Sequence, residues 1–166
     1  LFAPQAASAL GVDHNRDMLA MARANIDSAG LEGAEVRLGD IENLDVGRNI
    51  YDLVLIHQVL HFLHDPAMAV AEAVRALAPG GTIAIVDFAT HDNEVLRTEH
   101  QHLRLGFADD VMLGWLLEAG IADVQTHAVE TQANTDGGAK LLTVKIWVGR
   151  DPNYEIASAA TNRELA

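Results

Sequence analysis

Two aspartates each follow a short, largely apolar segment that is typical of a strand. Asp13 ends the segment 8–13, and Asp40 follows Val36-Arg37-Leu38-Gly39. A carboxylate at the carboxyl end of a strand in a nucleotide-binding sheet can accept both hydrogen bonds of a ribose diol, because it has two acceptor oxygens. An aspartate just before a helix is also a common helix cap, and one in a turn is often simply exposed. The position of Asp13 therefore fits ribose binding or capping.

Histidines are the other candidates for chemistry. His57 and His61 follow the apolar run Leu53 to Ile56, at the end of an expected strand. Ligands of open α/β sheets bind outside the carboxyl ends of the strands, which favours a binding role for this stretch. His61 could act as a base. A histidine within Val-Leu-His-Phe-Leu fits packing or capping equally well.

A metal site is the third possibility, because His91, His100 and His102 lie near Asp87 and Glu99 in the sequence. His100 and His102 are two residues apart, so their rings would face different sides of a helix. No His-Glu-x-x-His motif occurs in the sequence. The pattern therefore does not favour a metal, and we expect these residues near a substrate pocket instead.

The segment from Tyr51 to Phe88 predicts a strand, a crossover helix and a second strand. The unbroken apolar runs Leu53–Ile56 and Ile83–Val86 are typical of strands buried on both faces. Asp65 can cap the helix, and Pro66 suits its first turn. The helix has an apolar face of Val70, Val74 and Leu77, and Pro79-Gly80-Gly81 should end it. The result is a parallel βαβ unit.

Hydrophobic periodicity and turn residues predict the remaining elements. The helix 14–29 should be capped by Asn15, have Met18, Leu19, Ala22 and Ile26 on its apolar face, and stop at Gly30. The other elements are strands 8–13, 34–38, 122–129 and 140–148, helices 93–103 and 109–119, and a polar loop at 130–138. Alternating strands and helices indicate an α/β doubly wound sheet.

Composition limits the class of protein. The 166 residues suffice for one domain, and the net charge of −13 argues against a nucleic-acid partner. Cysteine is absent, no signal peptide is visible, and no apolar run reaches the roughly 20 residues of a membrane span, so we expect a cytoplasmic protein with no membrane contact. The first residue is Leu1 rather than Met, which leads us to expect a fragment, a processed product or a chain whose upstream part is not included.

The order Tyr51-Asp52, then Val59-Leu-His-Phe-Leu-His-Asp-Pro66, then Leu77-Ala-Pro-Gly-Gly-Thr82 resembles the class I S-adenosylmethionine-dependent methyltransferases. It is most similar to the small-molecule branch that contains the ubiquinone and menaquinone methyltransferases. The run 100–107 resembles methyltransferase domains fused to arsenic-repressor-type regulators. The resemblance implies a Rossmann-like sheet, mostly parallel, with an antiparallel terminal strand at one edge. Residues 1–150 would form a partial methyltransferase domain, and 151–166 a C-terminal tail with some helical bias.

The resemblance also implies site residues. S-adenosyl-L-methionine would be bound by its ribose at Asp13, with His14 and Met18 beside it, by its adenine at Asp40 and Ile41, and by its methionine end at His57. The small-molecule methyl acceptor would contact His61, His100 and Arg104. Methyl transfer mainly requires alignment and exclusion of water, so the absence of an evident catalytic dyad does not weaken this interpretation, and the catalytic residue stays unassigned.

One part of the family pattern is missing. No Gly-rich motif of the form apolar-Asp-x-Gly-x-Gly-x-Gly occurs in the sequence, although it should lie just before Asp13. We therefore expect the first family strand to be absent, which would leave a slot in the sheet and would favour a homodimer. The given chain alone would then be an incomplete catalytic domain that binds the cofactor poorly.

Three classes of function can be compared with these observations. The first is methyl transfer to a small molecule. A nicotinamide-dependent reductase is disfavoured because no Tyr-x-x-x-Lys pair occurs, and arsenic methylation because there is no cysteine. The alternative from another class is a non-catalytic module for ligand sensing or dimerisation in a regulator.

Overall fold

The computed structural model describes residues 3–133 and 140–153. These residues form two compact units, the first ending at Asp45 and the second starting at Val46. In the described part of the chain, no helix is long and apolar enough to cross a membrane. The expected helical bias of 154–166 and most of the expected loop 130–138 lie outside the described residues.

The first unit is a βαβ arrangement. It contains the short 3-10 helix η1 (Ala3–Gln5), β1 (Ala9–Asp13), α1 (Arg16–Ala29) and β2 (Ala34–Leu38). The strands β1 and β2 are parallel, with Ala9 opposite Ala34 and Asp13 opposite Leu38. The predicted strands and connecting helix are therefore confirmed.

Local capping fixes both ends of α1. The Asn15 side chain accepts hydrogen bonds from the backbone N–H groups of Asp17 and Met18, and Gly30 follows in the left-handed region with φ of 63°. Both caps were predicted. The predicted apolar face is only partly correct, because Leu19 is buried but Met18, in the first turn, is 50% exposed.

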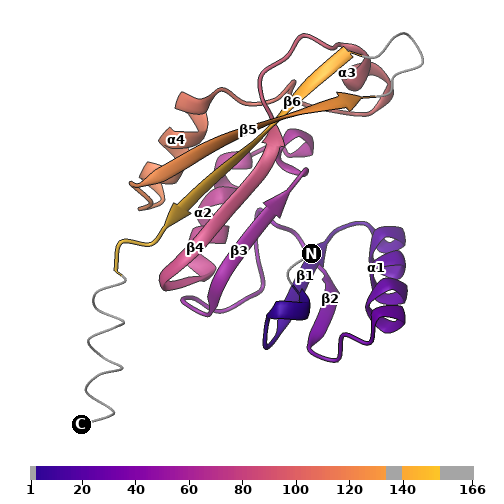
Figure 1. Ribbon diagram of the computed structural model, residues 1–166, viewed down its shortest axis with the longest axis vertical. Helices are drawn as coiled ribbons and strands as arrows, with labels where there is room; N and C mark the ends of the chain where they lie inside the picture. The colour runs from indigo at the N-terminus through magenta and orange to yellow at the C-terminus, as the bar shows by residue number, and fades with distance from the viewer. Residues whose placement is uncertain (1–2, 134–139, 154–166) are drawn as a thin grey trace. The chain divides into compact units, whose positions relative to one another are not determined.

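The second unit is a four-stranded sheet with helices (Figure 1). Its elements are β3 (Tyr51–His57), the 3-10 helix η2 (Leu60–Phe62), α2 (Pro66–Ala76), β4 (Leu77–Phe88), α3 (Val95–Glu99), α4 (Asp109–Glu118), β5 (Val124–Ala133) and β6 (Lys140–Arg150). The strand order is β3-β4-β6-β5. The pair β3–β4 is parallel and the pairs β4–β6 and β5–β6 are antiparallel.

The predicted crossover between β3 and β4 is confirmed in detail. The Asp65 side chain accepts the backbone N–H of Met68, and Pro66 is the first residue of α2. The end of the helix was predicted one residue too late. Leu77 already belongs to β4 and pairs with Tyr51, and the register then shifts so that Leu53 pairs with Thr82. The residues Ala78 to Gly81 form this irregularity, and Gly80 adopts φ of 76°.

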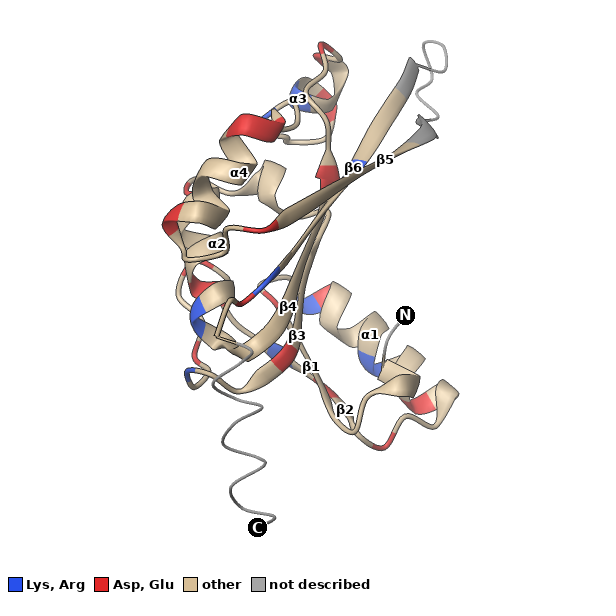
Figure 2. Cartoon of the chain, turned by 60° about the vertical axis from the view of Figure 1, so that its left-hand side comes forward, with Lys and Arg blue, Asp and Glu red and all other residues tan. Residues whose placement is uncertain are grey.

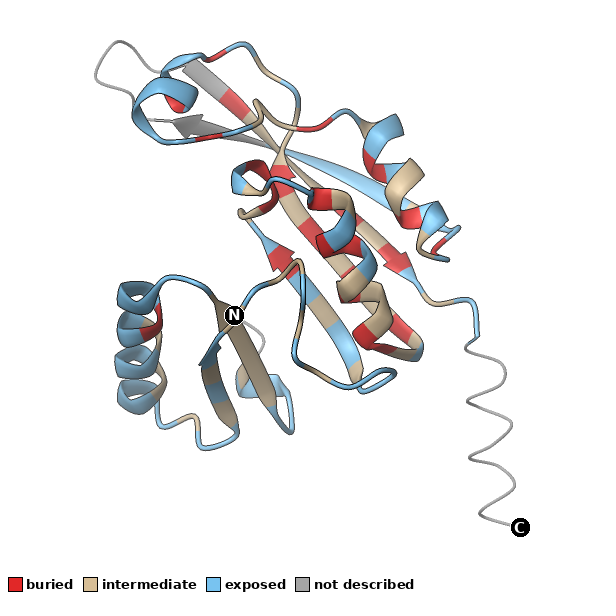
Figure 3. Cartoon of the chain, turned by 180° about the vertical axis from the view of Figure 1, so that it is seen from behind, coloured by how far each residue is buried: buried red, intermediate tan, exposed pale blue. Residues whose placement is uncertain are grey.

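The core of the second unit lies between the sheet and the helices α2 and α4, which cover the same face (Figures 2 and 3). Among its completely buried side chains are Val70, Ile83, Ile85, Met112, Leu116 and Trp147. The indole Nε1 of Trp147 donates to Asp109, whose carboxylate also pairs with Lys145. The hydrogen bond from Lys145 is the main cause that lowers the pKa of Asp109 below its usual value. The start of α4 is thereby attached to β6.

Several expectations about the second unit are corrected. The expected helix 93–103 is only the five residues of α3, because Gln101 adopts φ of 60° and the backbone N–H of His102 bonds back to the Leu96 oxygen. In α4, Val111 is 43% exposed and does not belong to the buried face. The strand β5 extends to Ala133, further than predicted, because it pairs with β6 along its length.

The described strands form two hydrogen-bonded sets, β1-β2 and β3-β4-β6-β5, as expected for a sheet that lacks its first family strand. Other features of the sheet differ from expectation. The last described strand, β6, lies between β4 and β5 rather than at the edge. One side of β4 is already paired with β3, so β6 pairs with its other side. The run 53–56 was expected to be buried on both faces, but Leu53 is 41% and Leu55 37% exposed. Among the described strands β3 pairs only with β4, which explains this exposure.

Gly106 provides a test of this fold. It has φ of 77°, and a Cβ atom there would overlap the backbone oxygen of Ala89. We expect Gly106→Ala to lower the free energy of unfolding by about 2–4 kcal/mol, measured by urea denaturation.

The matched control is Gly114→Ala in α4, where a Cβ atom would meet nothing within 4 Å. Since alanine is the better helix former, this substitution should raise stability by about 0.5–1 kcal/mol. Equal effects of the two substitutions would contradict the described backbone.

Candidate functional site

Asp13 lies at the carboxyl end of β1, where it participates in the turn that leads into α1. Its Oδ1 accepts the backbone N–H of Asn15 at 2.8 Å, and Nδ1 of His14 lies 3.8 Å from the same oxygen. The side chain remains 40% exposed. Within the described residues, Oδ2 has no hydrogen-bond partner. One oxygen therefore serves the turn, and the other can accept from a ligand.

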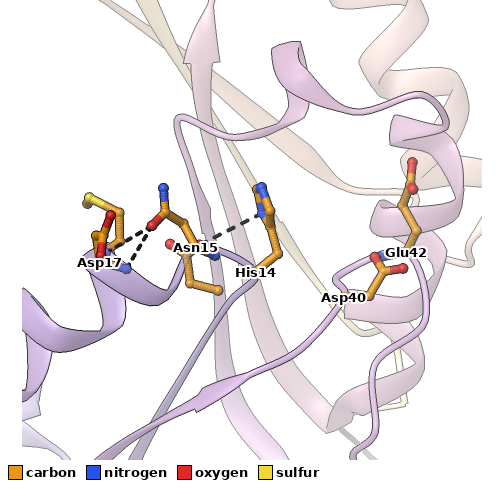
Figure 4. Close-up of polar contacts among 7 residues, drawn as sticks. His14, Asn15, Asp17, Asp40 and Glu42 are labelled. Atoms are coloured by element: carbon orange, nitrogen blue, oxygen red, sulfur yellow. Dashed lines mark hydrogen bonds and ion pairs between the residues drawn. The ribbon is translucent and has the colours of Figure 1, made fainter.

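Asp40 lies beside Asp13 at the same edge of the first unit. The two strands are parallel, Asp13 is opposite Leu38, and the N–H of Gly39 donates to the Asp13 backbone oxygen at 3.0 Å. Oδ1 of Asp40 accepts the backbone N–H of Glu42 at 2.8 Å (Figure 4). Asp40 is thus an exposed turn residue whose carboxylate also has a second oxygen.

The other predicted cofactor residues of the first unit surround these aspartates in the sequence. His14 is 76% exposed at its side chain, Met18 is half exposed, and Ile41 is partly buried. Exposed apolar and imidazole side chains next to two carboxylates suit a ligand with a planar ring and a polar sugar. Their contact with a cofactor stays a prediction.

His57 is the last residue of β3, and its side chain is exposed. The next residue, Gln58, has φ of 54°, and its N–H donates to the Val86 oxygen at 2.8 Å. The chain therefore turns sharply at the carboxyl ends of β3 and β4. This is the edge where His57 was expected. The contact of His57 with a ligand stays a prediction.

His61 is buried within η2, with 2% exposure. Its Nδ1 lies 2.7 Å from Oδ1 of Asp87, a residue of β4 with no exposure. The backbone N–H of Leu60 donates to Asp87 Oδ2 at 3.1 Å, and that of Phe88 donates to Oδ1 at 2.8 Å. Two backbone N–H donors and one imidazole nitrogen thus surround one buried carboxylate.

A second imidazole completes this cluster. The ring of His102 stacks on that of His61, with centroids 4.1 Å apart, and the rings of Phe62 and Phe88 adjoin both. His102 is 6% exposed. Desolvation, together with the nearby His61 and His91, lowers the pKa of His102 to about 4. His102 is therefore neutral at pH 7.

The two remaining predicted substrate residues differ in their surroundings. His100 is exposed and follows α3. Arg104 is partly buried, and its guanidinium donates to the backbone oxygens of Leu63 and His64. Its backbone N–H and that of Leu103 donate to the His61 oxygen. Arg104 thus ties the segment after α3 to η2, and its contact with a substrate stays a prediction.

From the sequence, Asp87 was considered only as a possible metal ligand and was not paired with His61. The available signal was an aspartate at the end of the apolar run Ile83–Val86, where burial demands a partner. Among the described residues, no group of three or more histidine, aspartate or glutamate side chains could hold a metal ion.

Comparison with known proteins gives a consistent picture. A family model described as a methyltransferase domain matches residues 1–85. The chain is 29% identical over 133 residues to phosphatidylethanolamine N-methyltransferase of Cereibacter sphaeroides, covering 77% of this chain and 64% of that protein. It is 26% identical over 102 residues to the uncharacterized methyltransferase YcgJ of Bacillus subtilis, covering 61% and 40%. The chain spans only 21% to 64% of the length of the curated relatives that it matches first.

Solved structures share the fold. The crystal structure of YcgJ superposes with a TM-score of 0.74 at 16% identity, covering 90% of this chain and 85% of that one. The [4+2]-cyclase SpnF superposes with a TM-score of 0.68 at 18% identity, covering 87% and 66%. The predicted Rossmann-like fold is thereby confirmed. Because SpnF is named for a cyclisation, the fold by itself does not determine the reaction.

The buried His102 predicts how stability depends on pH. Its pKa is lower in the folded chain than the usual 6.5, so the unfolded chain binds more protons between about pH 6.5 and 4. Stability from this residue is therefore complete above pH 6.5 and is lost as the pH falls towards 4, by on the order of 2 kcal/mol. We expect His102→Gln to flatten this part of the pH profile, measured by urea unfolding at pH 7.5 to 4.5.

The control is His127→Gln, since His127 is exposed on β5. This variant should keep the slope of the wild-type chain. A His102→Gln slope identical to wild type would contradict the described burial of His102.

Proposed function

Since this chain belongs to the family of methyltransferase domains, we propose that the protein transfers a methyl group from S-adenosyl-L-methionine to a small-molecule acceptor. The observation that supports this proposal most strongly is the pair of aspartates at the carboxyl ends of the parallel strands β1 and β2. Ligands bind at this end of the strands in α/β folds.

The two aspartates fit the nucleoside part of this cofactor. Asp13 has one oxygen committed to the Asn15 N–H and a second without a partner in the described residues, so it can accept from a ribose hydroxyl. Asp40 would accept the adenine amino group, and the Ile41 side chain would pack against the ring. His14 and Met18 would border the ribose, and His57 would contact the methionine part.

The bound cofactor supplies a methyl group on a positively charged sulfur, which is already a good leaving group. The protein must therefore hold the acceptor in line with this bond and exclude water. His61, His100 and Arg104 are the residues that we assign to the acceptor side. The guanidinium of Arg104 holds the loop after η2, so part of its role would be to shape this side.

A small-molecule acceptor is supported by charge and by relatives. The net charge of −13 disfavours a nucleic-acid acceptor. Similar proteins are named for methyl transfer to phosphatidylethanolamine and to demethylmenaquinone. A non-catalytic ligand-sensing module remains the alternative, and it differs by binding the cofactor without forming product.

Calorimetric titration of this chain with S-adenosylhomocysteine tests the cofactor site. We expect Asp13→Ala to weaken binding about 10- to 100-fold, because hydrogen bonds to a charged group contribute about 1.5–3 kcal/mol. Asp27→Ala is the matched control, since Asp27 is an exposed residue of the last turn of α1. It should bind like the wild type.

Transfer of the labelled methyl group to an acceptor separates the two functions. Binding with product supports the methyltransferase, and binding without product for any acceptor supports the module. The absence of binding by a chain that is folded by circular dichroism would contradict the proposed cofactor site in this chain.

A further inference from the structure

The buried carboxylate of Asp87 determines the hydrogen-bonding state of His61. The backbone N–H groups of Leu60 and Phe88 donate to different oxygens of Asp87. Both oxygens therefore act as acceptors, and Nδ1 of His61, at 2.7 Å, must be the donor. In the neutral ring this places the hydrogen on Nδ1 and leaves the lone pair on Nε2.

The backbone around His61 is fixed on both sides. The N–H groups of Leu103 and Arg104 donate to the His61 oxygen at 2.9 and 3.1 Å, and the ring packs against His102. Within the described residues, Nε2 of His61 makes no hydrogen bond. The imidazole is therefore held in one orientation with one unused acceptor.

The position of this pair is that of a ligand site. Asp87 follows Val86, which is opposite His57 in the parallel pair β3–β4, so the pair lies at the carboxyl ends of both strands. Open α/β sheets bind ligands at this edge.

A neighbouring group also indicates a polar ligand. Nδ1 of His102 is buried and has no hydrogen-bond partner in the described part of the chain. A buried nitrogen of this kind is destabilising unless a water or ligand bonds to it. Nδ1 of His102 and Nε2 of His61 are thus two imidazole nitrogens that no described group hydrogen-bonds.

We propose that His61 is a catalytic base whose Nε2 takes the proton of the methyl acceptor, and that Asp87 is the positioning residue that fixes its tautomer. This inference rests on the proposed function. It assigns the acceptor to compounds that carry a hydrogen on the attacking atom, a hydroxyl or an amine.

The proposed step is balanced. The attacking oxygen or nitrogen forms a bond to the methyl carbon with its lone pair, and the carbon–sulfur bond breaks with its electrons going to sulfur. The hydrogen of the attacking atom moves to Nε2. The resulting imidazolium is stabilised by the Asp87 carboxylate until its proton passes to water.

Nitrogen-15 NMR of the histidine-labelled full chain tests the tautomer without any substrate. We expect His61, assigned by the loss of its signals in His61→Gln, to be the Nδ1-protonated tautomer. In Asp87→Asn the amide can donate to Nδ1, so the hydrogen of His61 should move to Nε2. A wild-type His61 with its hydrogen on Nε2 would overturn the proposal, even if Asp87→Asn does not fold.

Access to Nε2 is tested by diethylpyrocarbonate, which modifies free imidazole nitrogens, with mass spectrometry of the wild-type chain. We expect S-adenosylhomocysteine together with an acceptor analogue such as catechol to slow the modification of His61 at least threefold. This result would support the assignment of His61 as the catalytic base. A His61 that stays unmodified under conditions that modify exposed His127 would overturn it, because the acceptor could not reach it either.

The two proposals fail separately. If S-adenosylhomocysteine does not bind, the proposed function fails for this chain while the tautomer remains measurable. If S-adenosylhomocysteine binds equally to the wild type and to His61→Gln, and His61 has the expected tautomer, both the proposed cofactor site and the proposed role of His61 are supported. Equal rates of methyl transfer by wild type and His61→Gln to a hydroxyl or amine acceptor would refute the base; we expect a loss of about 100-fold or more.

Discussion

A carboxylate without solvent access must be hydrogen-bonded, and this constraint organises the carboxyl edge of the second unit. Asp87 is the second-last residue of β4 and has no exposure, and its partners come from η2 and from the residue that follows it. To supply them, η2 must turn back over the end of β4 as soon as β3 ends. The segment after α3 is then held against η2 through the backbone of His61. Removal of the carboxylate would leave the buried N–H of Leu60 and the buried Nδ1 of His61 without their partner, which is costly.

The sequence was sufficient to predict elements whose signals are local. The caps at Asn15, Asp65 and Gly30 depend only on residues within a few positions of the helix ends, and they were identified correctly. The prediction was wrong where distant partners decide. The helix of residues 93–103 is shortened by a contact between His102 and Leu96, and the place of β6 inside the sheet depends on its pairing with β4. Periodicity contains no information about such pairings.

The candidate site shows the same division. Asp13 and Asp40 were identified because each directly follows a strand, and the parallel register of β1 and β2 brings them to one edge. The pairing of His61 with Asp87 was missed, because the two residues are 26 positions apart and only the crossover of α2 brings them together. The low pKa of His102 could not be predicted either, since it results mainly from burial. Ligand contacts of the remaining site residues stay predictions.

The strand order β3-β4-β6-β5 has a consequence for synthesis of the chain on the ribosome. Translation produces β5 before β6, but β5 is joined to the sheet only through β6. Until the residues after about 140 have been made, β5 lacks the strand with which it pairs in the finished sheet. One side of β4 is unpaired for the same reason. Among the described strands, β6 is the last to be synthesised, and it completes the pairing of both β4 and β5. Because chains grow at about 5–20 residues per second, this interval lasts on the order of a second. During it, the exposed strand edges can pair with strands of other chains.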